Sequence, residues 1–100
     1  MNSKIELFHD FNKLYESPVE GWVKAPLICF GTHQQIEKEK ITLFEGQTLT
    51  LIDPDDIDKN GNPDRLEVEA KIHFDKENDY WFGEFQYSKL KYRSEKINET

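Results

Sequence analysis

The sequence is poor in cysteine and has no long hydrophobic run, and each scarcity excludes a class of protein. Cys29 is the single cysteine among 100 residues, which excludes an intrachain disulfide and a thiolate metal cluster. Its neighbours in "APLICFG" are apolar, so we expect a small buried side chain there rather than a reactive thiol. No window approaches the roughly 20 apolar residues of a membrane span. The first ten residues also lack the features of a signal peptide, so we expect a cytoplasmic protein without membrane contact.

Basic residues are scarce relative to acidic ones. The chain has 13 Lys and Arg against 20 Asp and Glu, which gives a formal net charge of −7 at pH 7. Between Asp53 and Glu69, seven acidic residues stand against Lys59 and Arg65, a local net charge of −5. Such a field repels phosphate backbones and attracts cations or basic protein surfaces. We therefore expect no nucleic-acid binding.

Aromatic residues, by contrast, are plentiful. They make up 13% of the chain, which argues for a folded core because disordered chains lack large apolar side chains. A chain of 100 residues is the size of one domain. We expect this domain to span residues 1–94, followed by a frayed tail over 95–100 that contains one apolar residue.

Most of the apolar pattern is typical of strands. In "LEVEAKIHF" apolar and polar residues alternate without a break, as in a half-buried strand with one wet face. Further strands are predicted in 21–31, in two runs of 41–53 separated by Glu45 and Gly46, in 80–88 and in 89–93. The fold class is therefore mainly β (α+β), a small antiparallel sheet curled into a partly open SH3-like or OB-like barrel.

The same alternation predicts which side chains form the core. The apolar faces of these strands contribute seven residues to the predicted core, and we expect Trp81 or Phe82 to pack on them. These are Leu49, Leu51, Leu66, Val68, Ala70, Ile72 and Phe74.

Two segments have a helical pattern. Residues 3–16 start with a capping box at Ser3 and Glu6 and carry apolar residues at helical spacing, which favours a possible N-terminal helix over a short strand in "KIELF". Thr32 and Gln35 form a second capping box, followed by a short helix of one or two turns or a loop, since only one apolar residue anchors it.

An acidic stretch, "DPDDIDKNGNPD" at 53–64, carries the most specific motif. Its spacing D-x-[DN]-x-[DN]-G-x5-E resembles the EF-hand calcium loop over residues 56–67. The resemblance implies calcium ligands from oxygen side chains, which calcium requires in numbers of six to eight. The implied ligands are Asp56, Asp58, Asn60, Asp64 and Glu67.

The flanks of this stretch differ from those of the EF-hand. Both read as strands rather than helices, Pro63 lacks the N–H that pairs two such loops, and no second loop exists in the chain. Asp, Asn, Gly and Pro are also the residues that turns favour, so a solvated hairpin loop remains the other interpretation.

No sequence motif indicates an enzyme. Glu67 and Glu69 lie on one face of a strand at a separation compatible with an acid and a base, but nothing marks a cleft around them. The three histidines lack the spacing of a zinc site. We therefore expect a small acidic, non-enzymatic protein-binding module of unknown biological role that binds a basic protein or forms a homodimer. The alternative is a calcium-binding β-domain that uses the 56–67 loop.

Overall fold

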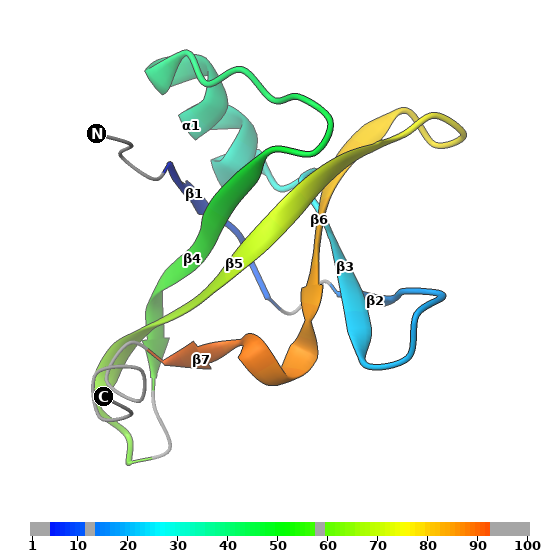
Figure 1. Cartoon of the computed structure of the whole chain (residues 1–100). Coiled ribbons are helices and arrows are strands. Elements are labelled where there is room, and N and C mark those ends of the chain that lie inside the picture. The colour runs from blue at the N-terminus through cyan, green and yellow to red at the C-terminus, as the bar shows by residue number, and fades with distance from the viewer. Residues whose placement is uncertain (1–4, 12–13, 58–59, 93–100) are drawn as a thin grey trace.

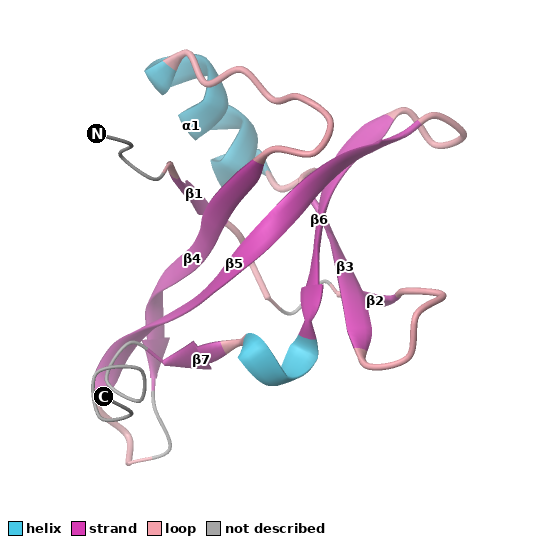
Figure 2. Ribbon diagram, in the orientation of Figure 1, coloured by secondary structure: helices cyan, strands magenta, loops and turns pink. Residues whose placement is uncertain are grey.

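The computed structural model describes residues 5–11, 14–57 and 60–92, which form one sheet and one α-helix (Figure 1). In chain order the elements are β1 (Glu6–Phe8), β2 (Tyr15–Glu16), β3 (Trp22–Pro26), α1 (Phe30–Glu39), β4 (Thr48–Ile57), β5 (Pro63–Asp75), β6 (Tyr80–Gln86), the 3₁₀ turn η1 (Tyr87–Lys89) and β7 (Lys91–Tyr92). Strands account for about half of the described residues, which confirms the mainly β class (Figure 2). Among the described residues, no helix is long and apolar enough to span a membrane.

The sheet departs in two ways from the predicted antiparallel barrel. Its order is β1-β4-β5-β6-β3-β2, and β1 runs parallel to β4, so the sheet is mixed. It is also not closed, and an SH3-like or OB-like barrel is not confirmed. The long strand β5 pairs with β6 over Lys71–Asp75 and with the short β7 at Leu66 and Glu67. The strands β6 and β7 thus pair with different parts of β5.

The predicted N-terminal helix is wrong, and the alternative strand in "KIELF" is correct. Residues 6–8 form β1, with Leu7 opposite Leu51 of β4, and Leu7 is fully buried. The apolar residues at helical spacing are used differently, since Phe11 and Leu14 lie in the segment after β1 and pack against the core. Pairing with β4 provides hydrogen-bond partners for the backbone of β1, so local helix propensity does not decide the structure of this segment.

Helix α1 is longer than the one or two turns predicted, and its capping box is wrong. The helix begins at Phe30, with Cys29 as an N-cap that makes no side-chain hydrogen bond, and Cys29 itself is half-buried rather than buried. Thr32 and Gln35 instead point from the helix to β1. The Thr32 hydroxyl donates to the Phe8 carbonyl at 2.6 Å, so tertiary contacts stabilise a helix that has few apolar residues.

The core lies on one face of the sheet, largely as the alternation predicts. Leu49, Leu51, Val68, Ala70 and Ile72 are buried, which confirms five of the seven predicted positions. The other two, Leu66 and Phe74, are half-buried. Trp81 packs against this core, as predicted, whereas the buried Phe82 lies opposite His73 on the other face of the sheet.

Gly83 allows β6 to approach this core closely. A Cβ at Gly83 would lie 3.1 Å from Leu51 Cδ1 and 3.2 Å from Ala70 Cβ, tighter than ordinary van der Waals contact. A glycine in a strand interior often marks such a close approach. The missing side chain at Gly83 therefore leaves room for the side chains of Leu51 and Ala70.

Candidate functional site

The acidic loop joins two strands, as its flanking patterns predict. Asp56 lies opposite Asp64 and Ile57 opposite Pro63 in the β4–β5 pairing, with a register shift between Asp53 and Asp56. The hairpin reaches away from the rest of the sheet at the lower left of Figure 1. The helix-loop-helix setting of an EF-hand is therefore absent at this loop, whose strands on both sides the structure describes.

The structure describes only some of the predicted calcium ligands. Asp58 and the side chain of Asp56 lie outside the described residues, and Asn60 is exposed. The Asp64 carboxylate accepts a hydrogen bond from the Arg65 N–H at 2.8 Å. In the described part of the chain, no group of three or more His, Cys, Asp or Glu side chains is arranged to hold a metal ion. The calcium site stays a prediction.

Glu67, the twelfth-position ligand of the motif, contacts arginine. Its Oε2 accepts a hydrogen bond from Arg65 Nε at 3.0 Å, and Arg65 Nη2 donates to Glu6 Oε2 at 2.7 Å. Arg65 thereby links the exposed faces of β5 and β1. Glu69, two residues further along β5, is exposed, so the structure does not join Glu67 and Glu69 into an acid–base pair within a cleft.

A second polar cluster crosses the exposed face of the sheet. His73 Nδ1 contacts Glu45 Oε2 closely, and His73 Nε2 lies 3.9 Å from Glu84 Oε1. The Ser17 hydroxyl donates to the other Glu84 oxygen at 2.7 Å. The hydrogen bond from His73, followed by one from the Phe74 N–H, lowers the pKa of Glu45. This cluster connects the loop before β4 with β5, β6 and the end of β2.

Sequence reasoning did not identify a partly apolar part of the surface that two hollows share. Two adjoining hollows, of about 420 and 510 Å³, share Ile28, Asp79 and Tyr80, and we name the pair the Tyr80 groove. The first hollow is further lined by Leu27, His33, Ile36, Ile41, Leu43 and Trp81. The second is further lined by Tyr15, Pro26 and Asn78.

Residues from distant parts of the chain meet in the Tyr80 groove. Tyr15 comes from β2, Ile28 from the link between β3 and α1, and Tyr80 from the start of β6. Tyr15 is 59% exposed and Ile28 50% exposed, so apolar surface of the groove faces solvent. Exposed apolar patches rimmed by polar residues are typical of interaction sites.

The turn between β5 and β6 forms an acidic rim on this groove. The Asp75 carboxylate accepts hydrogen bonds from the backbone N–H groups of Glu77 and Asn78 at 3.0 and 3.1 Å, and one from the Asn78 side chain. The side-chain bond from Asn78, with these backbone bonds, lowers the pKa of Asp75. Asp75 therefore holds the turn in place.

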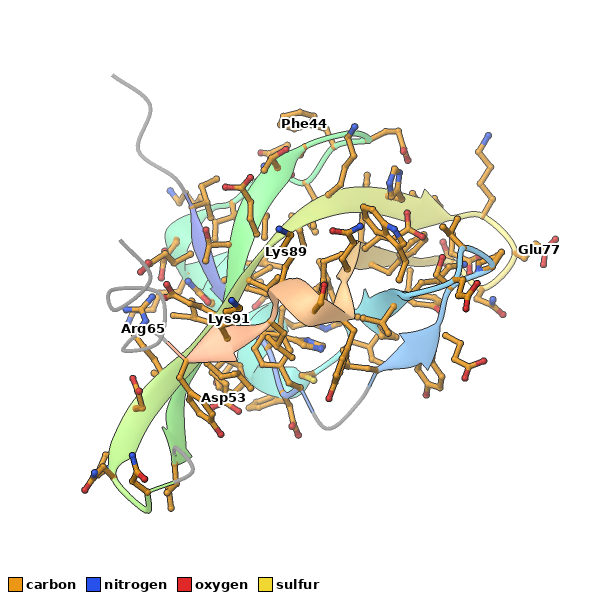
Figure 3. All side chains as sticks on the ribbon, turned by 60° about the horizontal axis from the view of Figure 1, so that its bottom comes forward. Phe44, Asp53, Arg65, Glu77, Lys89 and Lys91 are labelled. Carbon is orange, nitrogen blue, oxygen red and sulfur yellow. The ribbon has the colours of Figure 1, made fainter. Side chains whose placement is uncertain are left out.

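Two other acids of this turn are left to face solvent. Glu77 and Asp79 are exposed and form no ion pair with any of the residues that the structure describes. Figure 3 shows Glu77 at the tip of the turn, at the opposite side of the molecule from Arg65. Partial burial raises the pKa of Tyr80, with smaller contributions from Asp75 and Tyr15. The turn carries three acidic residues against Lys76, and Lys24 acts on Asp75 only as a small contribution, so the rim of the groove has a net negative charge.

Comparison with known proteins adds no relative: no family model, curated protein or solved structure matches this chain. Function is therefore argued from the surface itself.

Proposed function

We propose that this protein is a non-enzymatic binding module that captures a basic protein partner. The observation that carries the proposal is the Tyr80 groove, where exposed apolar side chains lie next to the carboxylates of Glu77 and Asp79, which form no ion pair with the described residues. Apolar contact supplies most of the affinity in such interfaces, and charge complementarity raises the association rate and selects the partner.

The charge of the whole chain supports a basic partner over the other classes. A net charge of −7 repels nucleic acid and also repels a second copy of the same chain. A homodimer would have to bring two acidic rims together, and like charges in contact oppose association. A basic protein is attracted by the same field that disfavours these partners.

The alternative function, calcium binding by the 56–67 loop, is favoured by one feature of the described residues. Gly61 has a φ of 81°, the backbone conformation that a glycine supplies at a sharp turn. Against it, Glu67 is held by Arg65, and strands flank the loop.

Two synthetic peptides that differ only in charge test the proposed function. Both have the same length and apolar residues, and one carries Lys and Arg where the other carries Glu. We expect saturable shifts of protein amide signals with the basic peptide and none with the acidic one. The affinity should fall as added salt shortens the Debye length from about 10 Å at 0.1 M to about 3 Å at 1 M.

Binding of both peptides with equal affinity, or of neither, would overturn the proposal. The oligomeric state of the peptide-free protein, measured by sedimentation, is the companion experiment. We expect a monomer, and a stable dimer whose interface covers the groove would instead support the homodimer.

A further inference from the structure

We infer that the second hollow of the Tyr80 groove, between Tyr15 and Tyr80, receives an arginine side chain of the basic partner. The inference rests on the proposed function and names the recognition element within it. Four features carry it: the two aromatic walls, the strand between them, the carboxylate on the rim and the apolar hollow alongside.

The strand order places the two tyrosines on opposite sides of one strand. In the sheet, β3 lies between β6 and β2, so Tyr80 and Tyr15 belong to strands that both neighbour β3. Register places their side chains on the same face of the sheet as Lys24 and Pro26. Tyr15 is level with Lys24 of β3, whereas Tyr80 lies two residues before Phe82, which is level with Pro26, so the two tyrosines are also offset along β3. Both tyrosines nevertheless line the second hollow together with Pro26, which lies between their levels on β3.

The rim supplies the counter-charge for a cation in this space. Asp79 lines both hollows and forms no ion pair with the residues of the described segments. Its φ of 58° is the left-handed conformation, held by a hydrogen bond from its N–H to the Asp75 carbonyl at 2.9 Å. The turn that Asp75 stabilises therefore presents the Asp79 carboxylate beside the hollow before any partner arrives.

Arginine fits this combination better than lysine. A guanidinium group is planar, stacks on aromatic faces, and can donate two parallel hydrogen bonds to one carboxylate. It is also less strongly hydrated than an ammonium group, so a partly apolar hollow lined by Ile28 and Pro26 costs it less.

The first hollow determines what stands next to this arginine in the partner. Its lining is mostly aliphatic, with Trp81, and it is continuous with the second hollow at Ile28 and Tyr80. A partner segment that fills both hollows therefore presents an apolar side chain next to the arginine. Because the two hollows share three residues, one short segment reaches both.

Three capped peptides that differ at one position test this inference on the full chain. Each carries a leucine near a variable residue, which is arginine, lysine or citrulline, the last having the shape of arginine without its charge. We expect amide shifts centred on Asn78, Asp79 and Tyr80, with affinity in the order arginine, lysine, citrulline.

Two variants and two matched controls locate the binding. Asp79→Asn removes the charge and retains a residue type that tolerates positive φ, and Tyr15→Leu removes the ring from an exposed position. Each should weaken the arginine peptide about two- to fivefold, which corresponds to the usual size of exposed ion pairs and cation–π contacts. Glu20→Gln and Tyr87→Leu change exposed residues that do not line the groove and should leave the affinity unchanged.

Failure of this inference differs from failure of the proposed function. If the arginine peptide binds but shifts the amides of the β4–β5 hairpin, or if Asp79→Asn has no effect, the hollow is not the arginine site and the proposed function still stands. Equal affinity for arginine and citrulline also overturns the inference. If no basic peptide binds the protein at all, both proposals fall together.

Discussion

Gln35 of α1 hydrogen-bonds the backbone of β1 on both sides of Leu7. Its Oε1 accepts from the Phe8 N–H at 2.8 Å, and its Nε2 donates to the Glu6 carbonyl at 2.7 Å. One amide side chain thus occupies the donor and acceptor positions that a further strand would use at this edge of the sheet. Covering an edge in this way protects it from pairing with another chain.

Gln35→Ala is therefore expected to destabilise the protein. The Phe8 N–H would lose its partner, which costs about 1 to 3 kcal/mol for a group that is partly buried. Gln34→Ala, on the exposed part of the same helix, should change the free energy of unfolding by less than about 0.5 kcal/mol. Urea denaturation of both variants is the measurement, and equal costs would show that the contact to β1 contributes nothing.

Ile72→Ala tests the register of β5. Ile72 is fully buried, so its truncation should cost about 2 to 5 kcal/mol, which approaches the total stability of a domain this small. Glu69→Gln, on the exposed face of the same strand, should cost less than about 0.5 kcal/mol. Thermal or urea unfolding would compare them. Similar losses at the two positions would contradict the alternation that defines the core.

The contact between Glu45 and His73 predicts a loss of stability in acid. The folded-state pKa of Glu45 lies below its ordinary value of 4.5, mainly because of the hydrogen bond from His73. A carboxyl group with a lowered pKa stabilises the fold above its unfolded-state pKa, and this contribution disappears as the pH falls through the folded-state pKa. The loss should therefore begin near pH 4.5 and continue below it.

Glu45→Gln isolates this contribution. The variant should be less stable than the natural chain at neutral pH, and the gap should narrow as the pH falls from about 7 to about 3. Asp75 titrates in both proteins and does not alter the difference. Melting temperatures at each pH are the measurement, with the exposed Glu20→Gln as a control. A gap that stays constant with pH would rule out the Glu45 carboxylate as its source.

The acidic loop is expected to respond weakly to calcium. Glu67 is engaged by Arg65, and strand pairing reaches Ile57 and Pro63, so the loop lacks the geometry of an EF-hand. Calcium and magnesium should give the same small, unsaturating amide shifts, as diffuse screening does.

A saturable response to calcium alone would instead establish the alternative function. It would raise the free energy of unfolding by RT ln(1 + [Ca]/Kd), and Asp58→Ala would abolish this response while leaving the fold intact. Magnesium would then do less, because it gives up its water less readily.

The local sequence pattern was sufficient to predict the buried side chains of strands that have one buried face. The unbroken alternation of residues 66–74 fixes which side chains point to the core, since a shift by one residue would expose all of them. The strand flanks of the acidic loop followed from the same rule, and the excess of acidic charge was evident from composition alone.

Residues 3–16 show where local pattern failed. Their apolar spacing and capping box favoured a helix over a strand, and pairing of β1 with β4 produced the strand instead. The length of α1 was decided in the same way, because Thr32 and Gln35 bond to β1 rather than to the helix end.

By itself, the sequence determined the strand-rich class, the buried face of the central strands and the negative charge, because these depend on residues next to one another. The tertiary structure alone decided the edge position of β1 and the existence of the Tyr80 groove. Tyr15, Ile28 and Tyr80 are far apart in the chain and adjoin one hollow only through the strand order β6-β3-β2. No local sequence pattern predicts this groove, because contacts between residues far apart in the chain form only when the whole sheet is assembled.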